Sequence, residues 1–243
     1  MRDTDKDWNA IAERAPFYGV ISIDKFLNPE PNNIEEFYAL GEQHVAEELD
    51  YIRSRFAGFS PNSALDFGCG VGRLAIPIAK AVGRTCGVDV ADRMLELARQ
   101  RASEVGLAGQ MEFTKTVPTD RRFDWVNTFI VLQHIPPAVG YSLIADLWNC
   151  VARGGLISLH VTAYKDARMS SEVARELGMF NYDGEQLKVY GGAPIDTGHL
   201  SMFDYDLSRV FGILNLPHNQ TILMKATDHG GCHGFVIYAN KTT

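Results

Sequence analysis

The residues whose types and spacing favour chemistry form one glycine-rich segment, Asp66-Phe67-Gly68-Cys69-Gly70-Val71-Gly72-Arg73. The segment follows a short apolar run and precedes a helical pattern, so we expect it at a strand-to-helix turn. Glycine lets a backbone pass close to a ligand, and the free N–H groups at the start of a helix attract a carboxylate or phosphate. The segment therefore predicts a site for a nucleotide-type cofactor.

The spacing of the glycines narrows the kind of cofactor. A dinucleotide site requires G-x-G-x-x-G, whereas Arg73 stands here at the place of the third glycine. A phosphate-binding G-x-x-x-x-G-K-[ST] loop is absent, because the turn supplies no lysine. Asp89 ends the next predicted strand, roughly 20 residues beyond Gly68, which is the distance of a carboxylate that accepts hydrogen bonds from both ribose hydroxyls.

Four features in this order resemble the class I S-adenosylmethionine-dependent methyltransferases. D-x-G-x-G-x-G stands at 66–72, and Gly87-Val88-Asp89-Val90 is similar to the second motif of that family. The segments 123–136 and 153–155 resemble small-molecule members. The resemblance is strongest over residues 60–165. It implies an enzyme that binds S-adenosyl-L-methionine and methylates a small molecule, with O- or N-methylation favoured over C-methylation.

The resemblance also assigns the cofactor contacts. It places Asp66 and the backbone of the glycine turn at the methionine end of the cofactor; the turn residues are Gly68, Cys69, Gly70 and Gly72. It places the Asp89 carboxylate at the ribose and the apolar Val90 side chain on the adenine. Phe129, at the end of a strand, is placed at the sulfonium. Lys115-Thr116 departs from the family, because relatives often carry an acidic residue there for the adenine amine. A backbone group is expected to replace that contact.

His134 is the residue best suited to act as a general base. It follows the fourth predicted strand on the cofactor side, and imidazole titrates near neutral pH. The alternative is that His134 caps or pins the turn at Pro136-Pro137. His160 lies inside the fifth predicted strand and is expected as a core histidine.

Other histidine and cysteine residues predict no metal site and no disulfide. The spacings of five residues near the C-terminus match no recognised ligand pattern. These residues are His199, His218, His229, Cys232 and His233. The four cysteines lie far apart in apolar or glycine-rich surroundings, which favours reduced thiols.

Two regions are expected to shape the pocket for the methyl acceptor. One is the N-terminal helical stretch, which carries Tyr18 and Tyr38, and the other is the segment 164–200, which begins with Tyr164. Tyrosine offers a hydroxyl and a ring face to a substrate, and loops on a rigid scaffold commonly carry specificity. The alternative for each tyrosine is packing against the core alone.

The elements that position these residues alternate between strand and helix. Strands are predicted over 63–67, 85–90, 111–113, 124–129, 156–161, 221–226 and 234–239, and a late helix over 206–214. This alternation predicts a doubly wound, Rossmann-like α/β sheet of seven mostly parallel strands, with an antiparallel last strand. Gly154-Gly155 is expected to cap the helix before the fifth strand. Residues 1–60 are predicted to form a helical lid and 61–243 the core, with 164–200 as a pocket insertion.

Composition narrows the partners and the location. The 243 residues include 30 Asp and Glu against 23 Lys and Arg, and the net charge of −7 weighs against a nucleic acid or an anionic membrane. The N-terminal residues lack the apolar run of a secretory signal, and the uncharged run 125–145 contains Asn127 and Pro136-Pro137, which a lipid-facing helix does not tolerate. We therefore expect a cytoplasmic protein with a small-molecule partner, and the oligomeric state stays open.

Two alternatives to methyl transfer stay open at this point. A regulatory module that binds S-adenosylmethionine without catalysis needs the same binding residues. Transfer of another group from the same cofactor needs them as well. Methylation of nucleic acid is disfavoured, because Asn127 is followed by Thr128-Phe129-Ile130 rather than by Pro-Pro and an aromatic residue.

Overall fold

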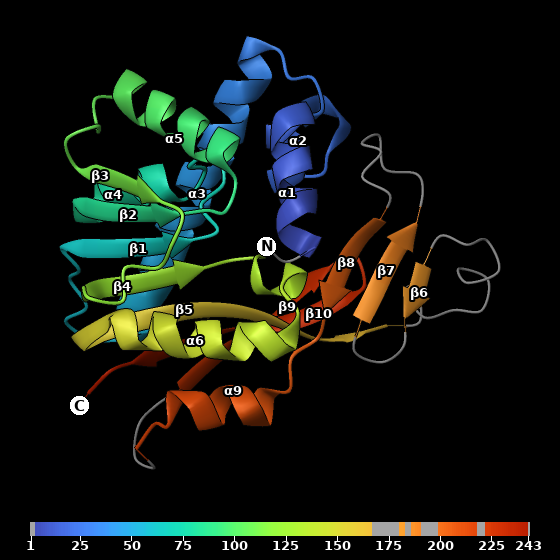
Figure 1. Ribbon diagram of the computed structural model, residues 1–243. Coiled ribbons are helices and arrows are strands. Elements are labelled where there is room, and N and C mark those ends of the chain that lie inside the picture. Colours follow the sequence, from blue (N-terminus) through green and yellow to red (C-terminus); the bar gives the residue numbers. More distant parts are fainter. Residues whose placement is uncertain (1–2, 167–179, 183–185, 191–198, 218–221, 243) are drawn as a thin grey trace.

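The computed structural model describes residues 3–166, 180–182, 186–190, 199–217 and 222–242. Its centre is a seven-stranded sheet in the order β3-β2-β1-β4-β5-β10-β9 (Figure 1). The strands are β1 (Ser63–Phe67), β2 (Arg84–Val88), β3 (Met111–Thr114), β4 (Phe123–Thr128), β5 (Val151–Lys165), β9 (Ile222–His229) and β10 (Cys232–Asn240). β1 to β5 pair in parallel, and β10 runs antiparallel to both of its neighbours. The predicted mostly parallel sheet with an antiparallel last strand is confirmed.

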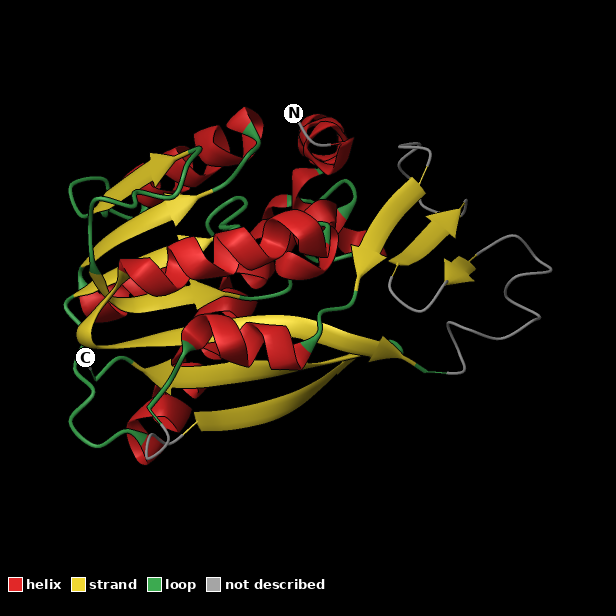
Figure 2. Ribbon diagram, turned by 60° about the horizontal axis from the view of Figure 1, so that its bottom comes forward, coloured by secondary structure: helices red, strands yellow, loops and turns green. Residues whose placement is uncertain are grey.

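Helices cover both faces of this sheet (Figure 2). They are α3 (Pro31–Arg55), α4 (Ala75–Val82), α5 (Asp92–Glu104), α6 (Pro137–Cys150) and α9 (Leu207–Leu214). Leu65 and Val126 share one buried cluster with α6 and α9, whereas Ala64 and Trp125 share another with α3 and α4. Successive strand residues therefore face opposite helical layers, which is why both faces of these strands are apolar. Among the described residues, no helix is long and apolar enough to span a membrane.

In the N-terminal region, one long helix packs into the core, and shorter helices lie near the strand ends. α3 begins with Pro31 and a capping box between Glu30 and Asn33, and its apolar side packs into the core beside α4. α1 (Asp3–Arg14), α2 (Pro16–Val20) and the short 3-10 helix η1 (Asp24–Phe26) precede it. α1 and α2 lie near the carboxyl ends of the parallel strands (Figure 1). That residues 1–60 together act as a helical lid stays a prediction.

A second, three-stranded antiparallel sheet occupies part of the predicted insertion at 164–200. It contains β6 (Phe180–Tyr182), β7 (Gln186–Tyr190) and β8 (His199–Phe203). β8 packs against the 3-10 helix η2 (Leu132–His134). A buried ion pair between Lys165 and Asp204 joins the end of β5 to the residue after β8. The insertion thus brings Ser201 and Met202 to the carboxyl end of the main sheet.

The predicted cap of α6 at Gly154-Gly155 is wrong. α6 ends at Cys150, and β5 begins at the next residue. Gly154 has a φ of +79°, and its N–H donates a hydrogen bond to the carbonyl of Lys241 at 2.6 Å. The two glycines form an irregular start of β5 beside the C-terminal strand, and β5 is consequently longer than the predicted 156–161.

Candidate active site

The carboxyl ends of β1 and β4 bring two polar side chains together. The strand register pairs Asp66 with Asn127, and Asn127 Nδ2 donates a hydrogen bond to Asp66 Oδ1 at 2.7 Å. Burial raises the pKa of Asp66 to about 7, although the Asn127 hydrogen bond and the charge of Arg73 lower it. The site therefore holds a buried carboxyl group that titrates near neutral pH.

The turn after β1 requires glycine for both conformational and steric reasons. Gly68, Gly70 and Gly72 have φ values of +75°, +52° and +86°, in the region that glycine adopts at no steric cost. A Cβ atom on Gly68 would lie 2.2 Å from Cγ2 of Val131, and one on Gly70 would lie 2.9 Å from Cγ2 of Val20. The turn is therefore a close backbone cradle that side chains would fill.

Asp89 joins this cradle to the end of β2. Its Oδ2 atom accepts a hydrogen bond from the N–H of Gly70 at 2.9 Å, and Oδ1 accepts one from the N–H of Ala91 at 2.9 Å. Burial raises the pKa of Asp89, and these backbone donors oppose the shift. Each carboxylate oxygen retains acceptor capacity beyond one hydrogen bond. Asp89 can thus hold the turn and a ligand's hydroxyl groups at the same time.

The strand ends face a cavity of about 500 Å³, which lies within the usual range of small-molecule sites, roughly 300–1,000 Å³. Its walls come from α1, the α2 region, the glycine turn, the ends of β2 and β4, η2, β8 and β9. Trp8, Arg73, Ile130, Gln133, Met202 and His229 are among its lining residues.

Most of the residues predicted from sequence lie on this one cavity. Those in the lining are Asp66, Gly68, Cys69, Gly70, Asp89, Val90, Phe129 and His134. Lys115, at the departure from the family pattern, lines it as well. Gly72 lies outside the lining, where a Cβ atom would meet Ile76 of α4 at 2.9 Å. The structure thus brings together residues that are up to 68 positions apart, from Asp66 to His134.

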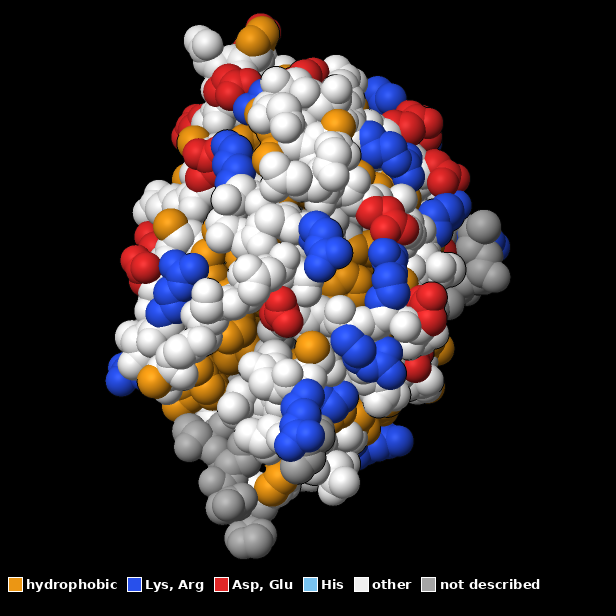
Figure 3. Space-filling model, turned by 90° about the vertical axis from the view of Figure 1, so that its left-hand side faces the viewer, with side chains coloured by type: hydrophobic (Ala, Val, Ile, Leu, Met, Phe, Trp, Pro, Cys, Tyr) orange, Lys and Arg blue, Asp and Glu red, His pale blue; other side chains and the backbone are white. Residues whose placement is uncertain are grey.

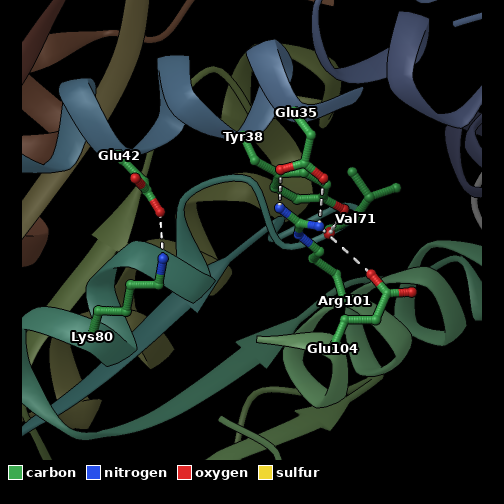
Figure 4. A network of polar contacts seen from close by, with 7 residues as sticks. All are labelled: Glu35, Tyr38, Glu42, Val71, Lys80, Arg101 and Glu104. Carbon is green, nitrogen blue, oxygen red and sulfur yellow. Dashed lines mark hydrogen bonds and ion pairs between the residues drawn. The ribbon is translucent and has the colours of Figure 1, made fainter. Parts of the chain in front are cut away.

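Tyr38 lies outside the cavity lining and supports the glycine turn from behind (Figure 4). Its hydroxyl donates a hydrogen bond to the carbonyl of Val71 at 3.1 Å. The guanidinium of Arg101 lies 4.5 Å from the centre of the ring and is paired with Glu35. These contacts join α3 to the turn and to α5. We therefore do not retain Tyr38 in the acceptor site.

Removal of this hydroxyl is expected to affect stability rather than ligand selection. Tyr38→Phe leaves the buried Val71 carbonyl without its partner, so the free energy of unfolding should fall by about 1 kcal/mol. Chemical denaturation measures the change, with Tyr51→Phe as the control, since Tyr51 packs against Tyr238 away from the turn. A variant as stable as wild type would show that the hydrogen bond contributes nothing.

The other two predicted tyrosines also lie outside the cavity lining. Tyr18 packs with Trp8 and Leu27 around Ile11 and Ala15 of the N-terminal helices. Tyr164 is 52% exposed, and its ring stacks on His233 with the centres 4.7 Å apart. Neither is retained as an acceptor contact. The side chains of Tyr182 and Tyr190 lie outside the described residues.

His134 lines the cavity but has contacts at both ring nitrogens. Nδ1 lies 3.4 Å from the carbonyl oxygen of Ser201, and Nε2 lies 3.0 Å from Nε2 of Gln133. The ring of Trp8 packs edge-on against the imidazole at 5.0 Å between centres. Burial lowers the pKa of His134 to about 4. The imidazole is therefore neutral at physiological pH, as a base must be, yet neither nitrogen is free.

Three further cavity residues were not predicted to bind anything. Nε of Arg73, Oε1 of Gln133 and Nε2 of His229 are buried polar atoms without a hydrogen-bond partner within the described residues. Such atoms are uncommon in folded proteins, and these three residues share one cavity. Sequence signalled only Arg73, as the residue at the place of a third glycine. Their convergence makes the cavity the candidate ligand site.

The histidines give no metal centre in the described part of the chain. There, no group of three or more His, Cys, Asp or Glu side chains is arranged to hold a metal ion. His160 is fully buried, accepts a hydrogen bond from the N–H of Ile130 at Nδ1, and contacts the Thr227 hydroxyl at Nε2. The prediction of a core histidine is confirmed. The side chains of His199 and His218 lie outside the described residues.

Comparison with known families places a methyltransferase domain over residues 64–155. A ubiquinone biosynthesis O-methyltransferase of Actinobacillus pleuropneumoniae is 32% identical over 98 residues, which cover 36% of this chain and 41% of the relative. The enzyme of the same name from Vibrio vulnificus is 28% identical over 152 residues, covering 55% and 63%. The chain thus matches less than two thirds of the length of these relatives.

Solved structures extend the likeness over the whole fold. A magnesium protoporphyrin IX methyltransferase from Synechocystis with bound S-adenosylmethionine has a TM-score of 0.60, with 18% identity, 99% of this chain covered and 98% of that one. At this level of identity the likeness establishes the fold. The element order and sheet topology of the chain are those of that fold, and the glycine turn lies within the matched domain.

Proposed function

We propose that this chain, whose residues 64–155 match a methyltransferase domain, transfers a methyl group from S-adenosylmethionine to a small molecule in the cavity described above. The observation that carries the proposal is the convergence of Asp66, the glycine cradle and Asp89 on one cavity. Arg73, whose Nε atom has no hydrogen-bond partner within the described residues, adds a cation to the same lining where an anionic ligand group is expected.

The residues present fit the cofactor. Asp66 and Arg73 offer opposite charges to the amino and carboxylate groups of its methionine end, beside the backbone of the cradle. Asp89 would accept hydrogen bonds from the ribose hydroxyls, and Val90 would pack on the adenine. Lys115 is exposed and pairs with Asp92, so backbone groups are left to contact the adenine amine.

The acceptor is proposed to bind between α1, η2 and β8. When bound, the cofactor would supply a methyl group on a cationic sulfur: a lone pair of the acceptor would form the new bond to the methyl carbon as the methyl–sulfur bond breaks, the sulfur would leave as a neutral thioether, and the displaced proton of the acceptor would go to the solvent. The chain's own part is to align the acceptor and exclude water. Trp8 and Met202 supply apolar walls there, and Gln133 and His134 supply polar ones. The O-methyltransferase names of the relatives support a hydroxyl acceptor, and an amine fits the same chemistry.

A cofactor titration followed by a turnover assay tests the proposal. Calorimetry should detect binding of S-adenosylmethionine, and mass spectrometry of a panel of hydroxyl and amine compounds should detect a mass gain of one methyl group. Binding without turnover of any compound would support the regulatory module, and a different mass gain would support another group transfer. Failure to bind the cofactor would contradict the function itself.

Small molecules are favoured over nucleic acid as acceptors by the charge of the chain. The net charge is −7, whereas nucleic acid binding needs a concentrated positive surface. On the face that Figure 3 shows, Lys and Arg side chains are interspersed with Asp and Glu side chains. An assay with a duplex oligonucleotide at low salt provides the direct comparison.

Asp89→Ala is expected to weaken cofactor binding by about 2 kcal/mol, or roughly thirtyfold. The variant loses the acceptor for the ribose and also leaves the N–H groups of Gly70 and Ala91 without their partner. Calorimetry with S-adenosylmethionine measures the change. Asp92→Ala removes an exposed carboxylate three residues away and serves as the control. An unchanged affinity in Asp89→Ala would contradict the ribose assignment.

A further inference from the structure

Gln133 and His134 form an adjacent polar pair in the wall of the cavity. They belong to η2, the 3-10 helix that follows β4. Both side chains are buried, with 5% and 7% exposure, and both residues line the cavity. η2 is held from the other side by β8, which supplies the Ser201 carbonyl. The pair is therefore a fixed part of the wall beside the place proposed for the acceptor.

The contacts of His134 determine where its proton lies. A carbonyl oxygen only accepts hydrogen bonds, so Nδ1, at 3.4 Å from the Ser201 oxygen, must carry the hydrogen. The pKa of His134 is lowered to about 4 by burial, so the ring is neutral at pH 7 and Nε2 has only a lone pair. Gln133 lies 3.0 Å from that lone pair and must present its NH2 group to it.

This orientation leaves the amide oxygen of Gln133 as the group without a partner. Oε1 is buried and accepts no hydrogen bond from the described residues. Exchanging the amide's oxygen and nitrogen would place Oε1 against the lone pair of His134 Nε2, which is repulsive. The imidazole therefore fixes the amide, and the atom that Gln133, a residue of the cavity lining, leaves unpartnered within the described residues is an acceptor rather than a donor.

We propose that Gln133 Oε1 accepts a hydrogen bond from the hydroxyl or amine group of the methyl acceptor, and that His134 is a positioning residue which holds the amide in this orientation. The proposal rests on the proposed function and names its substrate class. Neutral hydroxyl and amine groups carry the hydrogen that Oε1 needs. A carboxylate presents only lone pairs and is selected against. A general-base role for His134 is not part of this arrangement.

The tautomer of His134 provides a test on the wild-type protein. Nitrogen NMR of protein labelled at histidine should show the hydrogen on Nδ1 of His134 at pH 7. The signals of His134 are assigned as those that disappear from the spectrum of the His134→Asn variant. A hydrogen on Nε2 would overturn the proposal, because Gln133 would then turn its oxygen to the ring. This measurement does not depend on any acceptor or cofactor.

Small aromatic probes test the selection itself. Phenol, fluorobenzene and benzoate have similar shapes but differ in the hydrogen they offer, and their binding is measured by ligand-observed NMR with S-adenosylhomocysteine present. Wild type should prefer phenol over fluorobenzene about tenfold and should bind benzoate no better than fluorobenzene, as one hydrogen bond implies. Equal binding of phenol and fluorobenzene, a preference for benzoate, or no binding of phenol would overturn the proposal.

Gln133→Met keeps the length of the side chain and removes its amide, so it should abolish the preference for phenol. Gln100→Met makes the same change on the exposed face of α5 and should leave the preference intact. A preference for phenol that is retained in Gln133→Met would overturn the proposal. If that variant does not fold, the comparison of probes on the wild-type protein still tests the proposal.

Titration with S-adenosylhomocysteine is carried out first. Failure of the protein to bind S-adenosylhomocysteine contradicts the proposed function, whereas the probe preferences and the His134 tautomer report on the role of Gln133.

Discussion

Asp66→Asn is expected to gain about 3 kcal/mol of stability relative to wild type between pH 5 and pH 8 in the protein without ligand. Burial raises the pKa of the Asp66 carboxyl from 3.8 to about 7. In this pH range the unfolded chain has already lost a proton that the folded protein retains up to about pH 7. The contribution of this group to stability therefore falls as the pH rises from 4 to 7 and stays at its lower value above 7. Asparagine carries no charge, so the variant lacks this fall.

Chemical denaturation at pH 5, 6, 7 and 8 measures the free energy of unfolding of both proteins. Asp92→Asn, which removes one charge at an exposed position, controls for the change in net charge. Asn127→Leu removes a hydrogen bond that lowers the pKa of Asp66, so it should move the wild-type decline to higher pH. A difference between Asp66→Asn and wild type that is constant with pH would contradict the assignment.

The same variant should bind S-adenosylmethionine more weakly, because it removes the charge proposed to face the cofactor's amino group. Stability and ligand affinity would then change in opposite directions. Such opposition is typical of functional groups kept in a fold at the expense of stability. Opposite changes in stability and affinity would distinguish Asp66 from a carboxyl group whose only role is structural.

The residues proposed to bind the cofactor could be placed on one cavity from the sequence because their signals are local. Asp66 and the glycine turn lie within eight consecutive residues, 66–73, and Asp89 ends the next strand. Once strands and helices alternate, parallel pairing brings the ends of β1 and β2 to the same edge of the sheet. The observed register, with Asp66 beside Gly87, follows from that rule.

The acceptor side was harder to predict because its contacts join distant parts of the chain. His134 meets Ser201, 67 residues later, through a small sheet whose strands are only three to five residues long. Tyr38 was expected at the substrate, but its hydroxyl meets Val71 behind the turn. That Arg73 and Gln133 have atoms without partners among the described residues is a property of packing. Residue type and spacing carry no signal for it.

Gly68→Ala is expected to lower the free energy of unfolding by about 4 kcal/mol, because it combines backbone strain with overlap. The φ of Gly68 is +75°, and an added Cβ would lie 2.2 and 2.6 Å from the two methyl carbons of Val131. Gly106 provides a matched control: its φ is +76°, and a Cβ there meets nothing within 4 Å. Gly106→Ala therefore reports the strain alone, about 1 kcal/mol.

Val131→Ala separates the two contributions, because it removes the methyl groups that the new Cβ would strike. In that background Gly68→Ala should cost about 2 kcal/mol, since Cβ of Val131 still lies 2.9 Å away. Chemical denaturation of the two single variants and the double variant gives the coupling energy. An equal cost in both backgrounds would show that the overlap with Val131 is not what requires glycine. Cofactor titration of Gly106→Ala should be unchanged, whereas Gly68→Ala should lose binding, because only Gly68 belongs to the cradle.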